Sequence, residues 1–338
     1  MWVIGITILI GVILGTIGTI RANKYTLGNW IDFGVFGLAQ GCLYALIALG
    51  YTLVYGILRM INFAHGEVFM AGAFTGYFIA QPLYDRGMLS DHPVVSLLMI
   101  GFVAIATSVL VAYLVERIAY RPLRRAPRLV PLITAIGASL FLQYTFSGLY
   151  GTGVKTYPDV PALTGKWYIF GIGILKTQAV VIMAAVVLMI VLYLFVQRTK
   201  TGKAMRAVSE DKDTAALMGI NVDETIVRTF ILGAALAGAA GVLYALLNKQ
   251  VHFYVGFQPG LKAFTAAVLG GIGNIPGAMI GGLVLGIVES VGPSLVLDGL
   301  GIPAPYQLKD AIAFTMLVLI LIFRPTGILG ERLAQKKA

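Results

Sequence analysis

The sequence predicts an all-α polytopic membrane protein with about 8–10 transmembrane helices. Hydrophobic residues make up 58% of the 338 residues and charged residues 12%, about half the charged fraction of an ordinary soluble domain. The mean hydropathy is +0.88. The apolar residues are grouped in segments of about 20 residues, the length that crosses a bilayer core of about 30 Å. Most charged residues lie between these segments.

Nine apolar segments follow one another along the chain. The first lacks a basic region before it and an obvious small-residue cleavage site, so we interpret it as a membrane helix rather than a signal peptide. Glycine pairs four residues apart indicate close helix packing, at Gly37/Gly41, Gly277/Gly281 and Gly282/Gly286. The segments run roughly over 2–20, 33–58, 63–81, 94–115, 129–150, 178–197, 229–248, 262–292 and 306–323.

The segment 262–292 is long for one span and short for two. Its centre, 270–277, contains four glycines and Pro276, which interrupt a helix. Irregular backbone at membrane depth is tolerated only against protein or water. We therefore expect a broken or re-entrant hairpin near 262–292. The alternative is a single kinked helix, which would change the number of crossings.

The loop 116–128 carries five arginines and one glutamate, which places it in the cytoplasm by the positive-inside rule. Counting crossings forward then places 151–177 outside, 198–228 inside and the C-terminus inside, provided that 262–292 enters and leaves on one face. The same counting puts Arg21 and Lys24 outside, against the charge rule. For the first segment, the count of crossings and the charge rule therefore predict opposite orientations.

A mixed-charge segment, 198–228, stands between two uncharged apolar flanks. Acidic residues followed by small and apolar residues and then Gly219 are typical of a short helix with its N- and C-terminal signals. Such a helix would offer an apolar face to a partner protein, whereas the alternative is a solvated loop with an incidental turn. The candidate contact residues are Glu210, Asp213, Thr214, Ala215, Ala216, Leu217, Met218 and Gly219.

Several polar or helix-breaking residues lie within the apolar segments. Charged side chains in lipid cost a few kcal/mol, so they usually face a cavity or a partner. A lining or gating role along a transport path is one interpretation of these residues. A polar cap or an interhelical hydrogen bond is the other. The candidates are Asn62, His65, Glu67 and Glu289.

Other functions lack the residues that they need. The glycine-rich stretch 270–277 has no following Lys-Ser/Thr and no preceding strand, so it does not predict a nucleotide loop. The three histidines are scattered without metal-ligand spacing, and Cys42 has no cysteine to pair with. The net charge of +10 comes mostly from short loops and does not predict nucleic-acid binding. The sequence also lacks the cluster of catalytic residues that would predict an enzyme.

Long stretches of the chain resemble one known family, the permease subunits of ATP-binding cassette (ABC) importers for branched-chain amino acids, specifically the Liv-type H subunit. The resemblance covers nearly everything from about residue 30 onward. The matching stretches are GLAQGCLYALIALGYTLVYGILRMINFAHGEVFMAGA at 37–73, ERIAYRPLRR at 116–125, TAIGASLFLQ at 134–143, GKAMRAVSEDKDTAALMGIN at 202–221, KAFTAAVLGGIGNIPGAMIGGLVLGIVES at 262–290 and RPTGILG at 324–330.

The resemblance implies a multi-pass protein of the inner (plasma) membrane that moves leucine, isoleucine, valine or related neutral amino acids by alternating access. It implies a second, M-type permease, two cytoplasmic ATPases and an extracytoplasmic solute-binding protein as partners. ATP and Mg would bind to the ATPases, so no cofactor is expected in this chain. The segment 198–228 would be the coupling loop, with 214–219 docking on an ATPase. The broken hairpin would lie along the pathway and serve as a gate, with Gly271, Gly273, Asn274 and Pro276 as its candidate residues.

This resemblance also divides the chain. Residues 29–330 form the expected permease domain, 1–28 an extra apolar helix and linker, and 331–338 a cytoplasmic tail. One alternative is the same architecture with urea or short amides as cargo. Another is a stand-alone secondary transporter, which would use intramembrane acids for ion coupling; Glu67 and Glu289 are the candidates for that role.

Overall fold

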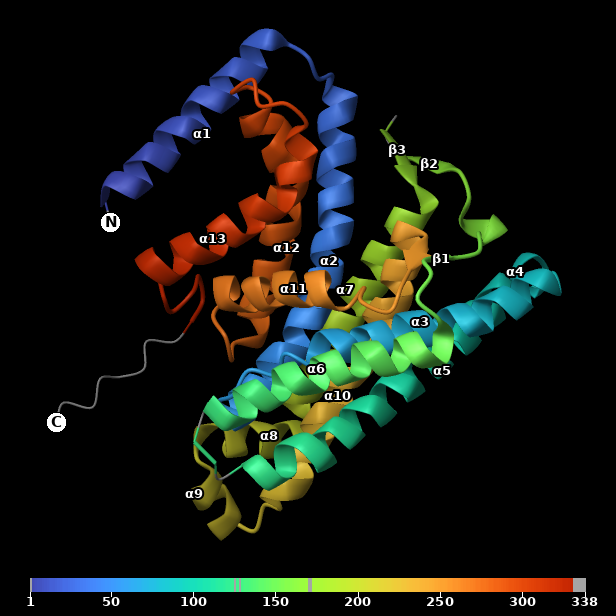
Figure 1. Ribbon diagram of the computed structural model, residues 1–338, viewed down its shortest axis with the longest axis vertical. Coiled ribbons are helices and arrows are strands. Elements are labelled where there is room, and N and C mark those ends of the chain that lie inside the picture. Colours follow the sequence, from blue (N-terminus) through green and yellow to red (C-terminus); the bar gives the residue numbers. More distant parts are fainter. Residues whose placement is uncertain (1, 125, 128, 170–171, 331–338) are drawn as a thin grey trace.

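The computed structural model describes residues 2–124, 126–127, 129–169 and 172–330, and these form a bundle of long helices (Figure 1). The α-helices are α1 Trp2–Ala22, α2 Leu27–Leu58, α3 His65–Asp85, α4 Met88–Asp91, α5 Pro93–Val115, α6 Leu129–Tyr150, α7 Lys176–Arg198, α8 Lys200–Glu210, α9 Lys212–Leu217, α10 Val222–Asn248, α11 Phe257–Gly270, α12 Ile275–Gly292 and α13 Lys309–Phe323.

Short elements complete the described part of the chain. The strands are β1 Lys155–Thr156, β2 Lys166–Ile169, β3 Ile172–Leu175 and β4 Gln250–Val251. Short π- and 3₁₀-helical turns are η1 Glu116–Tyr120, η2 Arg121–Leu123, η3 Pro161–Leu163, η4 Pro293–Leu297 and η5 Pro305–Leu308. Eight helical segments within the described residues are long and apolar enough to cross a membrane. The predicted class, an all-α polytopic membrane protein, is confirmed.

The two ends of the bundle differ in chemistry. We call one the charged end, because it holds the described part of 116–128 together with 198–228, joined by ion pairs from Arg121 and Arg124 to Asp223. The other is the strand end, where β1 pairs antiparallel with β4 and β2 with β3. The loops that the sequence predicts on one face thus lie together, and so do those predicted on the other.

The predicted hairpin is present, with its break at 271–274. Its first arm, α11, follows β4 at the strand end, and its second arm returns there, because Ser290 on α12 donates to the Phe33 carbonyl near the start of α2 at 2.7 Å. The arms pack side by side, since a Cβ on Gly281 would lie 2.1 Å from the Ala266 oxygen. The single kinked helix is therefore excluded. With 14 residues, α11 is about 21 Å long, shorter than a full span.

Small residues place the hairpin against the core helix α2. A Cβ on Gly286 would come within 2.2 Å of the Gly41 nitrogen, and one on Gly282 within 2.5 Å of Ala45 Cα. Backbones approach this closely only where side chains are absent or small. Two of the predicted glycine pairs, Gly37/Gly41 and Gly282/Gly286, therefore form the contact between α2 and α12, whereas Gly277/Gly281 packs against α11.

The first helix lies at the edge of the bundle and touches it through η4 (Figure 1). Thr19 Oγ1 donates to the carbonyls of Ser294 and Leu295, at 3.2 and 3.0 Å. Beyond the helix end, Lys24 Nζ lies 2.9 Å from Asp298 Oδ1. Lys24 thus sits at the strand end, opposite the arginine-rich loop, as forward counting predicts. The charge of Lys24 is paired there with the Asp298 carboxylate.

Candidate functional site

The short helix α9 projects from the charged end of the bundle (Figure 1). Asp211 caps its start by accepting a hydrogen bond from the Thr214 backbone N–H at 2.7 Å, and hydrogen bonds from the Thr214 backbone and hydroxyl lower the pKa of this carboxyl. Gly219 follows the helix with φ +81°, the left-handed region that favours glycine. The short helix expected at 214–219 is present, but it runs over Lys212–Leu217, because Asp211 caps its start and Met218 its end.

Burial divides the candidate contact residues into two groups. Ala215 is 4% exposed and faces the bundle, whereas Leu217 is 88% exposed and Met218 is 78% exposed. Two large apolar side chains this exposed in a polar segment are typical of a binding surface. The other candidates are exposed as well, namely Glu210, Asp213, Thr214, Ala216 and Gly219.

The helix before it, α8, fixes α9 to the bundle. Met205 and Val208 are buried on its inner face, consistent with its apolar and polar sides. Arg59, at the end of α2 in a left-handed conformation with φ +56°, donates from Nη2 to the Ser209 carbonyl at 3.0 Å. The core helix α2 is therefore connected directly to the segment that carries α9.

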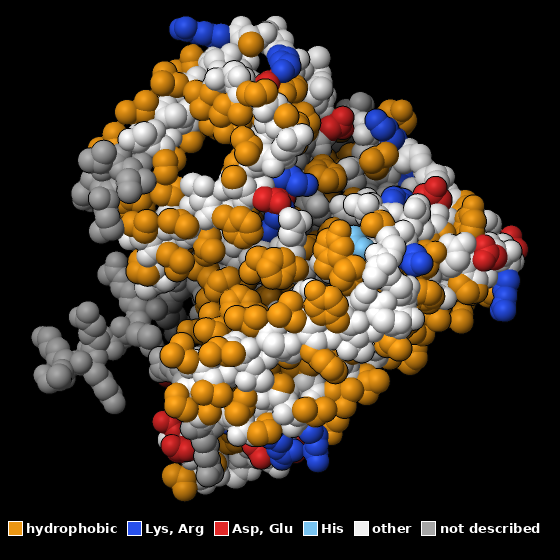
Figure 2. Space-filling view, viewed as in Figure 1, with side chains coloured by type: hydrophobic (Ala, Val, Ile, Leu, Met, Phe, Trp, Pro, Cys, Tyr) orange, Lys and Arg blue, Asp and Glu red, His pale blue; other side chains and the backbone are white. Residues whose placement is uncertain are grey.

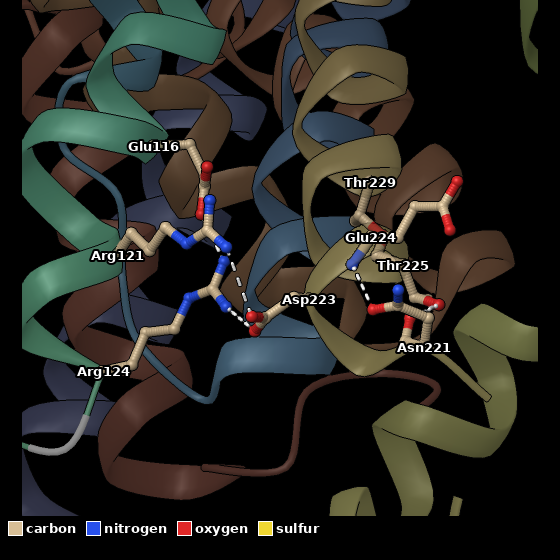
Figure 3. Close-up of polar contacts among 8 residues, drawn as sticks. All are labelled: Glu116, Arg121, Arg124, Asn221, Asp223, Glu224, Thr225 and Thr229. Atoms are coloured by element: carbon tan, nitrogen blue, oxygen red, sulfur yellow. Dashed lines mark hydrogen bonds and ion pairs between the residues drawn. The ribbon is translucent and has the colours of Figure 1, made fainter. Parts of the chain in front are cut away.

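A second connection at the charged end joins α5 to α10 (Figure 3). The side chains of Arg121 and Arg124 converge on Asp223, with Arg121 Nη2 at 3.4 Å from Oδ2, and Arg124 also pairs with the buried Glu116. Beside them, Asn221 Oδ1 accepts from the Glu224 N–H at 3.1 Å and caps α10. Sequence reasoning used these arginines for orientation alone and did not predict their partners.

Among the pathway candidates, Asn62 and His65 build the turn that starts α3. The Asn62 carbonyl accepts from the His65 N–H at 3.1 Å, and its Oδ1 accepts from the Tyr120 hydroxyl at 2.9 Å. The His65 ring lies edge-on to Tyr51, with 4.9 Å between centroids, in space that Gly50 leaves free. Both residues are buried and contact residues of neighbouring helical segments.

Glu67 lies two residues after His65, in the first turn of α3, and faces α6. Its Oε1 accepts from Gln143 Nε2 at 2.8 Å and from Ser139 Oγ at 3.1 Å. A cavity of about 290 Å³ adjoins this carboxylate. Sequence reasoning missed Gln143 and Ser139, whose signal was two polar residues four positions apart, on one face of an apolar helix.

The four candidates at 271–276 together form the turn of the hairpin. Gly271 and Gly273 have φ of +102° and +99°, and a Cβ on Gly271 would lie 2.5 Å from the Gly330 nitrogen. Asn274 Oδ1 accepts from the Gly277 N–H at 2.9 Å and caps α12, while Pro276 occupies the first turn of that helix. Together these residues reverse the direction of the chain between α11 and α12.

Glu289 on α12 belongs to a separate buried cluster. Lys262 Nζ on α11 lies 2.6 Å from Glu289 Oε1 and 2.6 Å from Asp310 Oδ1 at the start of α13. Sequence reasoning named Glu289 but missed Lys262 and Asp310. A single lysine among apolar residues was the signal for the first of these. One cation thus holds together the hairpin and the last helix, whereas Glu67 has its partners on α6.

A membrane bundle with a broken hairpin, buried charges inside it and a short helix with exposed apolar residues at one end has the features of a helical transport subunit. Comparison with known proteins gives the family. The model of the family described as "Branched-chain amino acid transport system / permease component" matches residues 34–321. The chain belongs to this family, and the resemblance predicted from the sequence is confirmed.

Curated relatives align over most of the chain. It is 42% identical over 305 residues to the high-affinity branched-chain amino acid transport system permease protein LivH of Escherichia coli K12, covering 89% of this chain and 95% of the relative. It is 45% identical to BraD of Pseudomonas aeruginosa, covering 89% and 96%. A probable LivH of Methanocaldococcus jannaschii is 30% identical, covering 85% and 89%.

Proposed function

We propose that this chain imports leucine, isoleucine, valine or related neutral amino acids through the inner membrane as one permease subunit of an ABC importer. The observation that carries the proposal is 42–45% identity, over 89% of the chain, to permeases named for high-affinity branched-chain amino acid transport. The eight candidate spans and the scarcity of charges within them fit a pathway for zwitterionic cargo. The C-terminus would lie in the cytoplasm.

The partners in this proposal are an M-type permease, two ATPases that bind ATP and Mg, and an external solute-binding protein. In it, α9 docks on an ATPase through the exposed Leu217 and Met218. Movement of the docked helix would reach α2 through the hydrogen bond from Arg59 to Ser209. A few kcal/mol of differential ATPase binding suffice to exchange outward- and inward-facing populations.

Ala216→Arg tests the docking step. Ala216 is exposed on α9, so the variant should fold normally, yet a long cation would block the approach of the ATPase. Uptake of leucine by vesicles containing all subunits should fall more than tenfold, while the Tm of the membrane domain stays unchanged. Ser90→Arg is the control, because it adds the same side chain to an exposed position at the opposite end. Normal uptake by Ala216→Arg would disprove docking through α9.

The cargo is tested in the same vesicles with radiolabelled leucine and urea. We expect ATP-dependent accumulation of leucine and none of urea. Accumulation of urea or acetamide without leucine would show that the architecture serves another cargo. Gradient-driven uptake without any ATPase would instead support a secondary transporter and reject the importer.

A further inference from the structure

A small apolar cavity opens between the starts of α3 and α11 and the middle of α6. Its volume of about 290 Å³ suits a ligand smaller than a typical drug molecule. Apolar side chains dominate its wall, notably Phe63, Ile136, Leu140, Phe257 and Leu261. Tyr51 and the Glu67 carboxylate add polar atoms to this surface. The lining is therefore that of a site for an aliphatic group with one charged end.

The Glu67 carboxylate is the unusual component of this wall. Its side chain is 1% exposed, and Oε1 already accepts two hydrogen bonds from α6. Oε2 is buried as well and has no hydrogen-bond partner among the described residues. None of the residues that line the cavity is lysine, arginine or histidine. A buried carboxylate without a cation is costly, so this oxygen is suited to a donor that enters from outside.

The backbone next to the cavity packs closely around that oxygen. Gly66 and Gly256 bring α3 and the start of α11 together, since a Cβ on Gly256 would lie 2.2 Å from the Gly66 oxygen. The same Cβ would lie 2.9 Å from Glu67 Oε2. On the opposite side, Gln143 and Ser139 fix the carboxylate through Oε1 alone. One oxygen is thus fixed by α6, and the other is buried beside Gly256 without a hydrogen-bond partner among the described residues.

We propose that this cavity binds a primary ammonium group with a branched aliphatic chain, with Glu67 Oε2 accepting from the ammonium and the chain packing on Leu140 and Phe257. The ligand would be the transported amino acid, so the inference rests on the proposed function. Glu67 confers selectivity for a positively charged amino group at this site. Ser139 and Gln143 are positioning residues that hold its carboxylate.

The test measures ligand binding to the purified complex of permeases and ATPases, without the solute-binding protein, from the rise in Tm with ligand concentration. Three probes separate the ends of the ligand: leucine, 3-methylbutylamine, which lacks the carboxylate, and 4-methylpentanoate, which lacks the amine. Leucine and the amine should raise Tm, and the carboxylate should not. Equal shifts with the amine and the carboxylate, or a shift with the carboxylate alone, would overturn the assignment.

Two variants tie the shift to the cavity. Glu67→Gln keeps the shape but removes the charge, and it should weaken binding of the amine more than tenfold. Leu140→Trp should fill the cavity and abolish the shift without altering Glu67. Leu149→Trp is the matched control, because Leu149 is exposed on the same helix and outside the lining. An undiminished shift in both Glu67→Gln and Leu140→Trp would reject the site.

The same preparation, supplied with binding protein and ATP, separates this inference from the proposed function. Leucine uptake by the wild type with no Tm shift from the amine would reject the cavity and leave the importer intact. Absence of leucine uptake would count against the proposed function itself. In Glu67→Gln, leucine delivered by saturated binding protein should bind more weakly in the pathway, so the rate of leucine uptake should fall. Binding of the ATPases to the permeases should stay unchanged.

Discussion

The first two helices are equally apolar and yet occupy opposite environments. The most apolar stretches of α1 and α2 have the same mean hydropathy of 1.8. In α2, 89% of those residues are buried within the protein, whereas in α1 the share is 11%. Hydropathy therefore identifies a helix that can lie in a bilayer, but it does not indicate whether protein or lipid surrounds that helix.

Contact with other helices explains the difference. α2 meets α12 through facing small residues such as Gly41 and Gly286, and it also packs against α10 and α11. α1 meets the bundle mainly at η4, and its Gly5 lies close to the Phe323 side chain at the end of α13. Figure 2 shows an opening in this face of the molecule between α1 and α13, bordered largely by hydrophobic side chains. Only one of the two helices is thus part of the core.

Gly286→Leu should have the largest effect, because its side chain would collide with the backbone of Gly41. Because a Cβ at this position would lie 2.2 Å from the Gly41 nitrogen, the overpacking should destabilise the protein by about 3 kcal/mol. Gly11→Leu in α1 is the matched control, since nothing lies within 4 Å of its Cβ position. Thermal unfolding in detergent measures both. Similar Tm values for the two variants would show that α2 and α1 are equally tolerant.

Lys262→Met should have the next largest effect, because it leaves Glu289 and Asp310 without their cation. Removing one partner of a buried pair costs about 3–5 kcal/mol. The double variant Lys262→Met/Glu289→Leu should recover part of that loss, because one of the orphaned charges is gone. If the double variant is no more stable than the single one, the Lys262–Glu289 pair does not stabilise the contact between the two arms of the hairpin.

The smallest effect concerns the attachment of α1. A hydrogen bond from Lys24 lowers the pKa of Asp298, so the folded state favours its charged form. Its contribution is present above the unfolded pKa and is lost as pH falls through the depressed folded pKa. Protection of the amides of 19–24 from hydrogen exchange should therefore decline at acidic pH. In Lys24→Ala this decline should move to higher pH; an unchanged profile would exclude the ion pair as the anchor.

Much of the fold follows from patterns within short stretches. Apolar length predicted the spans, and glycines with Pro276 predicted the break that the structure places at 271–274. The helix α9 was predicted from its acids and Gly219, with a start displaced by two residues because the cap is Asp211. These features are local, so one segment of sequence contains the physical cause.

The missed partners depend on contacts between distant segments. Lys262 and Glu289 are on different helices, and Gln143 reaches Glu67 from another helix 76 residues away. No periodicity within either helix specifies which polar side chain will face which. The burial of Ala215 likewise depends on how α9 packs against α8 and α10, which the sequence of α9 alone does not specify.

The contact between the hairpin and the end of the chain constrains the order of biogenesis. The carbonyls of Leu269 and Gly270, at the end of α11, accept from the N–H groups of Ile328 and Leu329 at 2.8 and 3.0 Å. Helix-end carbonyls have no partner within their own helix. During synthesis, α11 thus leaves the ribosome with an unfinished end, which is completed after another 58 residues have been translated, counting from Gly270 to Ile328. The hydrogen bonds at the turn of the hairpin are therefore completed only after α12 and α13 have been synthesised.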